Sequence, residues 1–302
     1  MTQKFVGLIG CGRMGIGLCR NLVLKGYSVI AYDLDEQALQ SARDLGARRA
    51  ADLDDLIATC SAIITCLPTI EAIKATYTGS KGLLHTCVPG TLLIETSSAD
   101  PAQRRSFGEL ASQRELELVD APMLRSAADA WKGTVQILLG GEPAAVARAR
   151  PYIEAVSEKI ISAGRLGDAH VMKALNNAVA MTNHAILGEI FTVAQHLGID
   201  GSTLFEMMRG SMAASYKLED LVPKLLANNH PRNAKLAFIE KDLAICCDAA
   251  RDTPVLTPVL DSAYLTYRVA CRMGGSEEPP SRLASILCGS ISQSGDPALP
   301  SK

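Results

Sequence analysis

The sequence lacks the charge pattern of a protein that binds nucleic acid or an anionic membrane. Its 302 residues include 30 lysines and arginines against 32 aspartates and glutamates, a net charge of −2. The cations are not gathered into a basic run, whereas phosphate-rich partners require clustered lysine and arginine. We therefore expect no nucleic-acid or membrane partner, and a small molecule is favoured instead.

Long apolar runs are also missing. No stretch reaches the roughly 18 to 20 uninterrupted apolar residues that a membrane-spanning helix requires. The opening "MTQKFVGLIGCG" begins like a signal peptide, with Lys4 before an apolar run, but Gly10, Gly12 and Arg13 interrupt that run too early. We expect a first β-strand there and a cytoplasmic protein.

Cysteine and histidine spacings give no sign of a disulfide framework or a metal site. The nine cysteines form an odd, scattered set without a Cys-x-x-Cys pair, and the five histidines show no His-x-x-x-His spacing. We expect reduced thiols and no metal. Packing or surface roles are expected for the histidines, which are His85, His170, His184, His196 and His230.

The apolar pattern changes near residue 162. Before it, short β-rich runs alternate with helical stretches such as 143–156, which is typical of βαβ units that build a parallel sheet. The expected strands are Phe5–Ile9, Val29–Tyr32, Ala62–Cys66, Thr91–Ile94, Leu116–Val119, Val135–Leu139 and Lys159–Ile161.

After residue 162 the pattern becomes helical throughout. Residues 170–198 form one run of about 29 residues at helical spacing that stops at Gly198, and no obvious strand follows. The sequence therefore predicts an α/β Rossmann domain over 1–162 and an all-α domain over 163–290, joined by a long interdomain helix. Glycine, serine and proline in 291–302 predict a flexible tail.

A glycine-rich turn follows the first predicted strand. Gly10-x-Gly12-x-x-Gly15 opens a helix and leads to a second strand that ends at Asp33. In this context Gly10 permits the turn, Gly12 lets a pyrophosphate approach the backbone, and Gly15 allows close helix packing. A glycine turn used only for packing is the alternative interpretation.

Asp33 is placed to accept hydrogen bonds from the adenosine ribose. The next residues, Leu34, Asp35 and Glu36, offer no cation to hold a 2′-phosphate, so NAD is expected in preference to NADP. The alternative is that Asp33 only caps the following helix.

Three polar residues share one face of the long predicted helix. Lys173, Asn176 and Asn177 are spaced i, i+3 and i+4. A lysine there can exchange a proton with the oxygen of a reacting carbonyl or alcohol, while an amide fixes the same oxygen. Lysines on helices are more often solvated, so the spacing alone leaves both interpretations open.

With these motifs the chain resembles the β-hydroxyacid dehydrogenase family, which includes the 3-hydroxyisobutyrate dehydrogenases, over about residues 4–270. Four segments match in order: "GLIGCGRMGIGLCRNLVLKGY", "DAPMLRSAADAWKGTVQILLGG", "GRLGDAHVMKALNNAV" and "IEKDLAI". "TCLPT" and "IETSSADP" are weaker matches. The resemblance implies a Rossmann domain, a long interdomain helix and a helical domain that commonly builds oligomers, here a homodimer or homotetramer.

The resemblance also implies roles for individual residues. Lys173 becomes the general acid and base, and Asn177 orients the reacting oxygen. The implied cofactor-binding residues are Gly10, Gly12, Arg13, Met14, Gly15, Asp33, Leu67, Pro68, Ser98 and Lys241. The implied substrate-binding residues are Ser98, Met123, Leu124, Arg125, Ser126, Asn176 and Lys241.

The chain departs from the family at its substrate turn. Leu124, Arg125 and Ser126 stand where most members have Ser-Gly-Gly, and the turn instead resembles that of the sulfolactaldehyde reductases, in which an arginine turn grips a sulfonate. Arg125 can offer two parallel N–H donors to an anion. The alternatives are that Arg125 faces solvent or pairs with Asp129. Ala180 lacks the hydroxyl of the sulfonate enzymes.

One smaller departure lies just before Lys173, where Ala169 replaces the family's third glycine. It allows a small shift of the helix start, which catalysis should tolerate.

The expected function is an NAD-dependent oxidoreductase for a small anionic substrate. It would interconvert a short 3-hydroxy acid, whose carboxylate or sulfonate Arg125 holds, with the corresponding aldehyde or ketone. An imine reductase is a second interpretation, although those enzymes usually lack the lysine. A non-catalytic NAD-binding sensor is a third.

Overall fold

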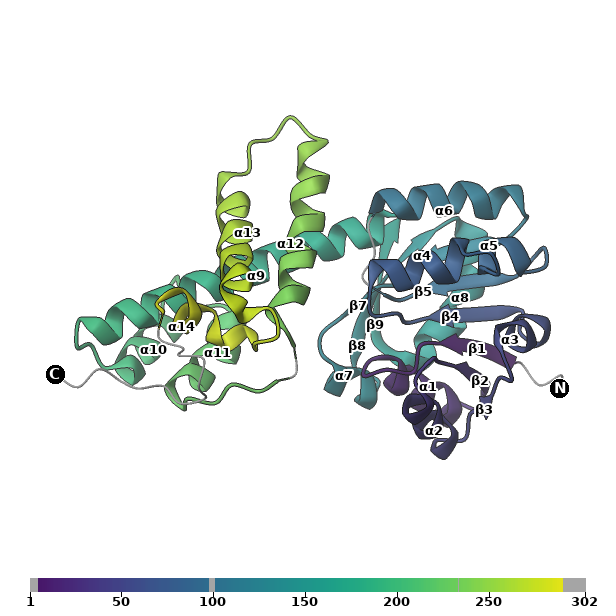
Figure 1. The fold of residues 1–302 in the computed structure, drawn as a ribbon, viewed down its shortest axis with the longest axis horizontal. Coiled ribbons are helices and arrows are strands. Elements are labelled where there is room, and N and C mark those ends of the chain that lie inside the picture. The colour runs from purple at the N-terminus through teal and green to yellow at the C-terminus, as the bar shows by residue number, and fades with distance from the viewer. Residues whose placement is uncertain (1–4, 98–100, 233, 290–302) are drawn as a thin grey trace. The chain divides into compact units, whose positions relative to one another are not determined.

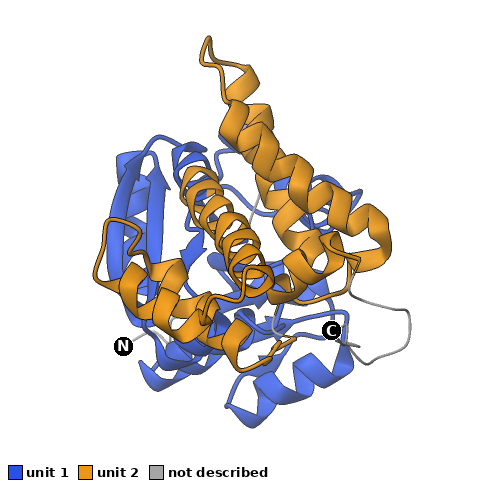
Figure 2. Cartoon of the chain, turned by 90° about the vertical axis from the view of Figure 1, so that its left-hand side faces the viewer, with its two compact units in different colours: residues 1–173 blue, residues 174–302 orange. Residues whose placement is uncertain are grey.

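The computed structural model describes residues 5–97, 101–232 and 234–289 (Figure 1). The chain divides into two compact units, residues 1–173 and 174–302 (Figure 2). The division falls within helix α9 (Asp168–His196), whereas the sequence pattern placed the boundary at residue 162. The predicted tail, 291–302, lies outside the described residues.

The first unit is built on a nine-stranded sheet in the order β3-β2-β1-β4-β5-β6-β8-β7, with β9 paired to β8. The chain order therefore reverses between β1 and β4, and in such sheets ligands bind outside the carboxyl ends of the strands at this point. The strands are β1 (Phe5–Ile9), β2 (Ser28–Tyr32), β3 (Arg48–Arg49), β4 (Ala62–Thr65), β5 (Leu92–Glu95), β6 (Glu117–Asp120), β7 (Met123–Leu124), β8 (Val135–Gly141) and β9 (Ser157–Gly164).

The predicted parallel sheet is correct for β1 to β6 and wrong at β7 and β8. Strand β8 runs antiparallel to both β6 and β7, and β9 is parallel to β8. Only the six-residue helix α7 (Ala127–Lys132) lies between β7 and β8. A parallel connection needs a crossover of a dozen or more residues to return to the opposite edge, so the chain reverses direction here.

Helices cover both faces of the sheet (Figure 1). Because successive strand residues point to opposite faces, Ile64 packs into one hydrophobic cluster and Ile63 into the other. Burying each such side chain contributes about 1.5 to 3 kcal/mol. One face carries α1 (Gly15–Leu24), α2 (Glu36–Asp44), α7 and α8 (Pro143–Val156). The other carries α3 (Leu53–Thr59), α4 (Ile70–Thr78), α5 (Leu83–Thr86) and α6 (Pro101–Gln113).

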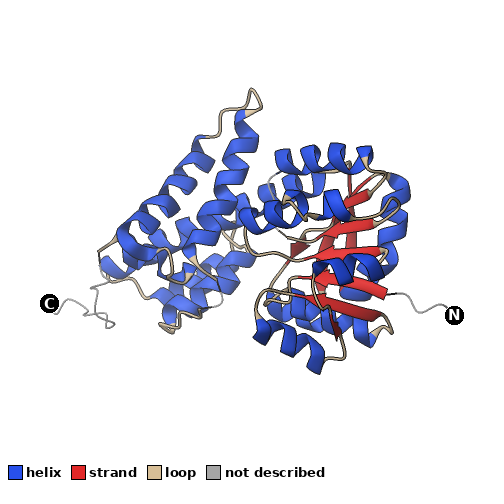
Figure 3. Ribbon diagram, turned by 45° about the vertical axis from the view of Figure 1, so that its right-hand side comes forward, coloured by secondary structure: helices blue, strands red, loops and turns tan. Residues whose placement is uncertain are grey.

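The second unit is helical throughout the part of it that the structure describes (Figure 3). Helix α9 spans 29 residues, close to the predicted run, and it ends shortly before Gly198, which has a φ of +73°. The other helices are α10 (Gly201–Arg209), α11 (Tyr216–Leu226), α12 (Leu236–Arg251), α13 (Pro258–Ala270) and α14 (Leu283–Leu287). Among the described helices, none combines the length and apolar character needed to cross a bilayer.

Candidate active site

The glycine turn between β1 and α1 is packed too closely for side chains at two of its three glycines. A Cβ atom on Gly10, whose φ is +94°, would lie 2.2 Å from the carbonyl oxygen of Cys66. One on Gly15 would lie 2.0 Å from the carbonyl oxygen of Gly10, but one on Gly12 would meet nothing within 4 Å. The backbone is therefore held tightly at Gly10 and Gly15 and is open to a ligand at Gly12.

The start of α1, beside this turn, suits a phosphate group. Met14 is the N-cap residue, directly after Arg13, and the helix has neither a side-chain cap nor an acidic residue in its first turn. The positive end of the helix dipole is thus left without a side-chain anion. These features fit the pyrophosphate of a dinucleotide. Packing alone does not account for the open backbone at Gly12.

Asp33 lies at the end of β2, next to the glycine turn. Its Oδ2 accepts a hydrogen bond from the N–H of Cys11 at 2.6 Å, and its Oδ1 accepts one from the N–H of Asp35 at 2.9 Å. The cap of α2 is Asp35 itself, which accepts from the N–H of Gln37, so the alternative helix-capping role belongs to a different residue. Each Asp33 oxygen keeps a second lone pair with which to accept a ribose hydroxyl.

A cation from another strand reaches the segment that follows Asp33, and the sequence pattern did not indicate it. Arg49 on β3 contacts the carboxylate of Glu36 through two nitrogens, at 2.5 and 2.7 Å. Because Glu36 neutralises Arg49, the segment still favours a ribose without a 2′-phosphate.

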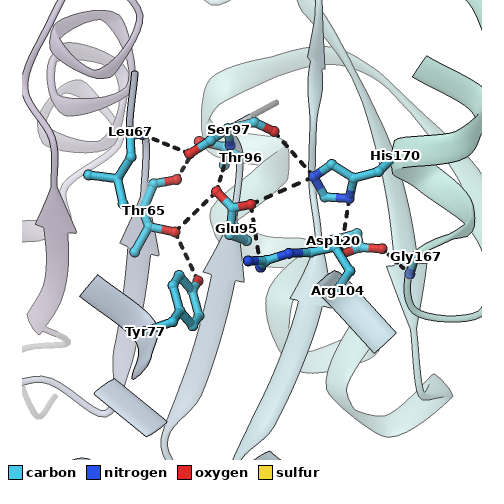
Figure 4. Close-up of polar contacts among 10 residues, drawn as sticks. All are labelled: Thr65, Leu67, Tyr77, Glu95, Thr96, Ser97, Arg104, Asp120, Gly167 and His170. Carbon is cyan, nitrogen blue, oxygen red and sulfur yellow. Dashed lines mark hydrogen bonds and ion pairs between the residues drawn. The ribbon is translucent and has the colours of Figure 1, made fainter. Parts of the chain in front are cut away.

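Buried polar side chains join the carboxyl ends of β4, β5 and β6 (Figure 4). Ser97, two residues beyond β5, connects the elements. Its hydroxyl accepts from the N–H of Leu67 at 2.7 Å, and its own N–H donates to Glu95 at 2.8 Å. Leu67 and Pro68, which are predicted to contact the cofactor, follow β4. The predicted hydroxyl, Ser98, lies outside the described residues.

Glu95 is fully buried, and a fully buried arginine balances its charge. Arg104, on α6, lies with Nη1 3.4 Å from Glu95 Oε2, and its guanidinium lies 4.9 and 4.6 Å from the ring centres of Tyr77 and Phe107. Burial by itself raises the pKa of Glu95. The charges of Arg104 and His170 and the hydrogen bond from Ser97 outweigh it and hold that pKa at about 2. Glu95 is therefore a buried anion at neutral pH.

His170 attaches the first turn of α9 to this network. Its Nε2 lies 3.2 Å from the carbonyl oxygen of Ser97 and 3.6 Å from Glu95 Oε2, while its Nδ1 lies 3.2 Å from Asp120 Oδ1. Asp120 Oδ2 also accepts from the N–H of Gly167, just before α9. Burial alone would lower the pKa of His170, but the contacts with Asp120 and Glu95 raise it. The start of α9 is thus tied to two strand ends.

Lys173 follows His170 by three residues on α9, and so lies nearly on the same side of the helix. Its charge acts on the thiol of Cys66: burial raises the pKa of Cys66 to about 11, against the opposing influence of a Thr96 hydrogen bond and of Lys173. The backbone of Cys66 in turn packs against Gly10. The role of Lys173 as the catalytic lysine stays a prediction.

The predicted substrate segment follows β6. Met123 is buried and pairs with Ile137 in the sheet. Leu124, beside it on β7, is half-buried. Ser126 caps α7 in a reciprocal capping box with Asp129, so its hydroxyl is engaged within the helix cap.

Arg125 has the left-handed backbone conformation typical of glycine, and its side chain contacts Thr134 and Glu158. Its φ is +79°, a region that favours glycine, which the family has at this turn. Its Nη1 donates to the carbonyl oxygen of Thr134 at 2.7 Å and to Glu158 Oε2 at 2.8 Å. The guanidinium therefore pairs with Glu158 and not with Asp129, and its expected role as an anion anchor stays a prediction. Both contacts are made by Nη1, one of the three guanidinium nitrogens.

Asn21 joins the glycine-turn helix to the substrate segment. This buried residue on α1 donates through Nδ2 to the carbonyl oxygens of Gly17 at 2.8 Å and of Ala130 on α7 at 2.9 Å. A Cβ atom on Gly17 would lie 2.7 Å from the Ala130 oxygen. Helices α1 and α7 are thus in direct contact.

In the second unit, Asp242 on α12 brings two predicted residues together. It accepts from Asn177 Nδ2 at 3.0 Å, and its other oxygen lies 3.2 Å from Lys241 Nζ. Asn176 is exposed and contacts Asn177 at 3.3 Å. Asp242 was missed because the sequence pattern drew attention only to the neighbouring lysine.

Comparisons with known proteins match both units. A family model for the NAD binding domain of 6-phosphogluconate dehydrogenase covers residues 5–164, and one for the NAD-binding region of NADP-dependent 3-hydroxyisobutyrate dehydrogenase covers residues 167–287. Among characterised relatives, the NAD-dependent L-serine dehydrogenase of Pseudomonas aeruginosa is 29% identical over 91% of this chain and 95% of its own.

Two further matches have a similar extent. The L-threonate dehydrogenase of Cupriavidus necator is 26% identical over 95% of this chain and 97% of its own. The structure of Mycobacterium tuberculosis 3-hydroxyisobutyrate dehydrogenase with L-serine has a TM-score of 0.85 and 25% identity, over 95% of this chain and 99% of that one. The likeness thus covers nearly the whole length of each.

Proposed function

The chain belongs to the β-hydroxyacid dehydrogenase family, and from that premise we propose that it is an NAD-dependent oxidoreductase that interconverts a short 3-hydroxy acid and its aldehyde or ketone. The observation that carries the proposal is the place of Lys173. Lys173 follows His170 by three residues on α9, and the ring of His170 contacts Ser97 and Asp120 at the carboxyl edge of the sheet.

In this mechanism side chains of the protein transfer the proton, and the cofactor would supply the hydride chemistry. NAD, when bound, would supply the hydride acceptor for the alcohol carbon. Gly12 and the start of α1 would hold the pyrophosphate, and Asp33 would accept hydrogen bonds from the ribose. Lys173 takes the hydroxyl proton during oxidation and returns it during reduction, and its ammonium form stabilises developing negative charge on oxygen. Asn177, one helical turn later, orients that oxygen.

The substrate is proposed to carry an anion beyond the reacting carbon. Arg125 holds it through the nitrogens that do not contact Glu158, or after exchanging that carboxylate for the substrate. Met123 and the backbone of the turn shape the pocket, and half-buried Leu124 narrows it. The named relatives act on L-serine and L-threonate, which are both short hydroxy acids. These two compounds and 3-hydroxypropanesulfonate form the natural test panel.

The deciding experiment measures NAD-dependent oxidation across this panel by parent protein, Lys173→Ala and Arg125→Ala. Turnover that disappears in Lys173→Ala and shows a raised KM in Arg125→Ala supports the proposal. Carboxylate turnover that is indifferent to Arg125 would leave a hydroxyacid dehydrogenase without an arginine anchor. Tight NADH binding without any turnover would favour the sensor. Imine reduction in place of alcohol oxidation would favour an imine reductase.

We also propose that the enzyme is cytoplasmic and assembles as a homodimer or homotetramer. Support for assembly comes from the second unit, where Ile186 and Ile190 on α9 and Met212 are exposed and line an apolar hollow of about 330 Å³. Exposed apolar patches of this kind often mark contacts between subunits. Light scattering of the purified protein measures the assembly directly.

A further inference from the structure

We propose that His170 is a positioning residue, held as an imidazolium between Asp120 and Glu95, that fixes the start of α9, and with it Lys173, against the carboxyl edge of the sheet (Figure 4). This inference rests on the proposed function, because it assumes that Lys173 transfers the proton. His170 itself touches neither substrate nor cofactor in this scheme; it acts through the helix that carries Lys173.

The first argument is the hydrogen-bonding chemistry of the ring. Nε2 lies 3.2 Å from a backbone carbonyl oxygen, that of Ser97, and Nδ1 lies 3.2 Å from a carboxylate oxygen of Asp120. Both oxygens can only accept, and a neutral imidazole has one N–H to donate. The imidazolium carries an N–H on both nitrogens, so Nε2 donates to Ser97 while Nδ1 keeps its proton at ion-pair distance from Asp120; in a neutral ring one of the two nitrogens faces its oxygen with a lone pair.

The second argument is charge balance. The groups that face His170 are Asp120 from β6 and Glu95 from β5, and Glu95 is paired with Arg104 from α6. Glu95, Asp120, Arg104 and His170 are all buried, with exposures of 0 to 2%. Two carboxylates and one guanidinium leave one negative charge, which the imidazolium cancels. Burying an uncancelled charge is costly, so the surroundings favour the protonated ring.

The third argument is position. Asp120 accepts from Gly167, immediately before α9, and contacts His170 within its first turn. His170 also holds Ser97, whose hydroxyl accepts from the cofactor loop at Leu67. One protonated ring therefore joins the helix of Lys173 to the loops that follow β4 and β5. Loss of its proton would loosen this junction without removing any group that contacts substrate.

The proposal predicts distinct behaviour for His170→Gln. The glutamine amide can still donate to Ser97 but leaves the cluster with a net negative charge. We expect kcat to fall about 10- to 100-fold, with KM and the Kd for NADH within threefold of the parent. In parallel, amide hydrogens of residues 168–174 should exchange faster. The matched control is His196→Gln, the same change at an exposed site on the same helix, which should alter none of these quantities.

A double variant separates positioning from simple structural damage. In Asp120→Asn/His170→Gln the charges of Glu95 and Arg104 balance again, and the asparagine amide can donate to the glutamine oxygen. We expect this variant to recover most of the lost kcat. If His170→Gln does not fold, the double variant should fold and turn over; failure of the double variant to improve on the single one would overturn the charge-balance argument.

The protonation state is measured directly by nitrogen NMR of histidine-labelled parent protein, with His170 assigned by its absence from the variants. We expect both ring nitrogens of His170 to carry protons in the folded protein at neutral pH. A neutral His170 at pH 7, or a His170→Gln variant with the parent's kcat, would overturn the proposal. The NMR and hydrogen-exchange measurements do not depend on turnover. If no substrate of the panel were oxidised, the proposed function would be refuted, but these measurements would still test whether His170 is protonated and fixes the start of α9.

Discussion

The buried ion pair of Arg104 and Glu95 allows a quantitative test of how the first unit is held together. Arg104→Met keeps most of the side-chain volume between Tyr77 and Phe107 but removes the cation that lies 3.4 Å from Glu95. The carboxylate then stays fully buried with a weaker set of partners. Breaking one side of a buried pair costs about 3 to 5 kcal/mol.

That cost corresponds to a large shift in melting temperature. With an unfolding entropy of about 2.1 cal/mol/K per residue, a unit the size of residues 1–173 should lose roughly 8 to 14 °C. Urea unfolding followed by circular dichroism measures the free energy of unfolding, and calorimetry measures the melting temperature. The matched variant is Arg104→Met with Glu95→Gln, which removes both charges together and should recover at least half of the loss.

The comparison of the two variants decides the interpretation. If Arg104→Met alone costs less than 1 kcal/mol, the pair does not stabilise the sheet edge in the way that its burial implies. If the double variant is as unstable as the single one, the loss arises from packing against Tyr77 and Phe107, and the electrostatic reasoning is refuted.

Four other predictions concern the site. Lys173→Ala should lower kcat by about 10² to 10⁴, and fluorescence titration should find NADH binding nearly intact; a loss below tenfold would remove Lys173 from the mechanism. Glu158→Gln frees Arg125 from an exposed ion pair worth up to about 1 kcal/mol, so KM for an anionic substrate should fall by up to about fivefold, and a higher KM would argue against the anchor. Asp33→Ala should weaken NADH binding much more than it changes kcat, and equal use of NADP by the parent protein would contradict the cofactor preference. The pKa of Glu95 is lowered from 4.5 to about 2, so its stabilising contribution is present above pH 4.5 and is lost as pH falls toward 2; acid unfolding of Glu95→Gln should therefore depend less on pH over this range.

Local sequence patterns were sufficient where local geometry decides the structure. The glycine turn, the strand before it and the acidic residue after the next strand lie close in sequence, and the structure arranges them as predicted. The helix over Pro143–Val156 and the long helix α9 were also predicted closely, since the period of apolar residues and the glycine at Gly198 act within a few turns.

The same reasoning failed where partners are distant in sequence. The pairing of Arg125 with Glu158 was not predicted, because Glu158 lies 33 residues away on β9 and only the antiparallel reversal at β8 brings the two together. Arg49 reaches Glu36 because β3 adds to the edge of β2. No local spacing signals either pair.

His170 shows the difference most clearly. Its sequence neighbours are those of an ordinary helical residue, and a packing or surface role was expected. Its partners come from β5 and β6, and their oxygens meet the ring only when parallel strands place their carboxyl ends along one edge. The nearest signals in the sequence were Glu95 and Asp120, acidic residues at the ends of apolar strands.

The sequence by itself determined the Rossmann architecture, the family and the dinucleotide turn, because each depends on short-range periodicity or on residues that are contiguous in a motif. Only the tertiary structure decided how Arg125 and Ser126 are engaged, which residue caps α2, and how Glu95, Arg104, Asp120 and His170 balance their charges. Those outcomes depend on burial and on contacts between strand ends, and a buried charge selects its partners by position in space, which the order of residues along the chain does not display.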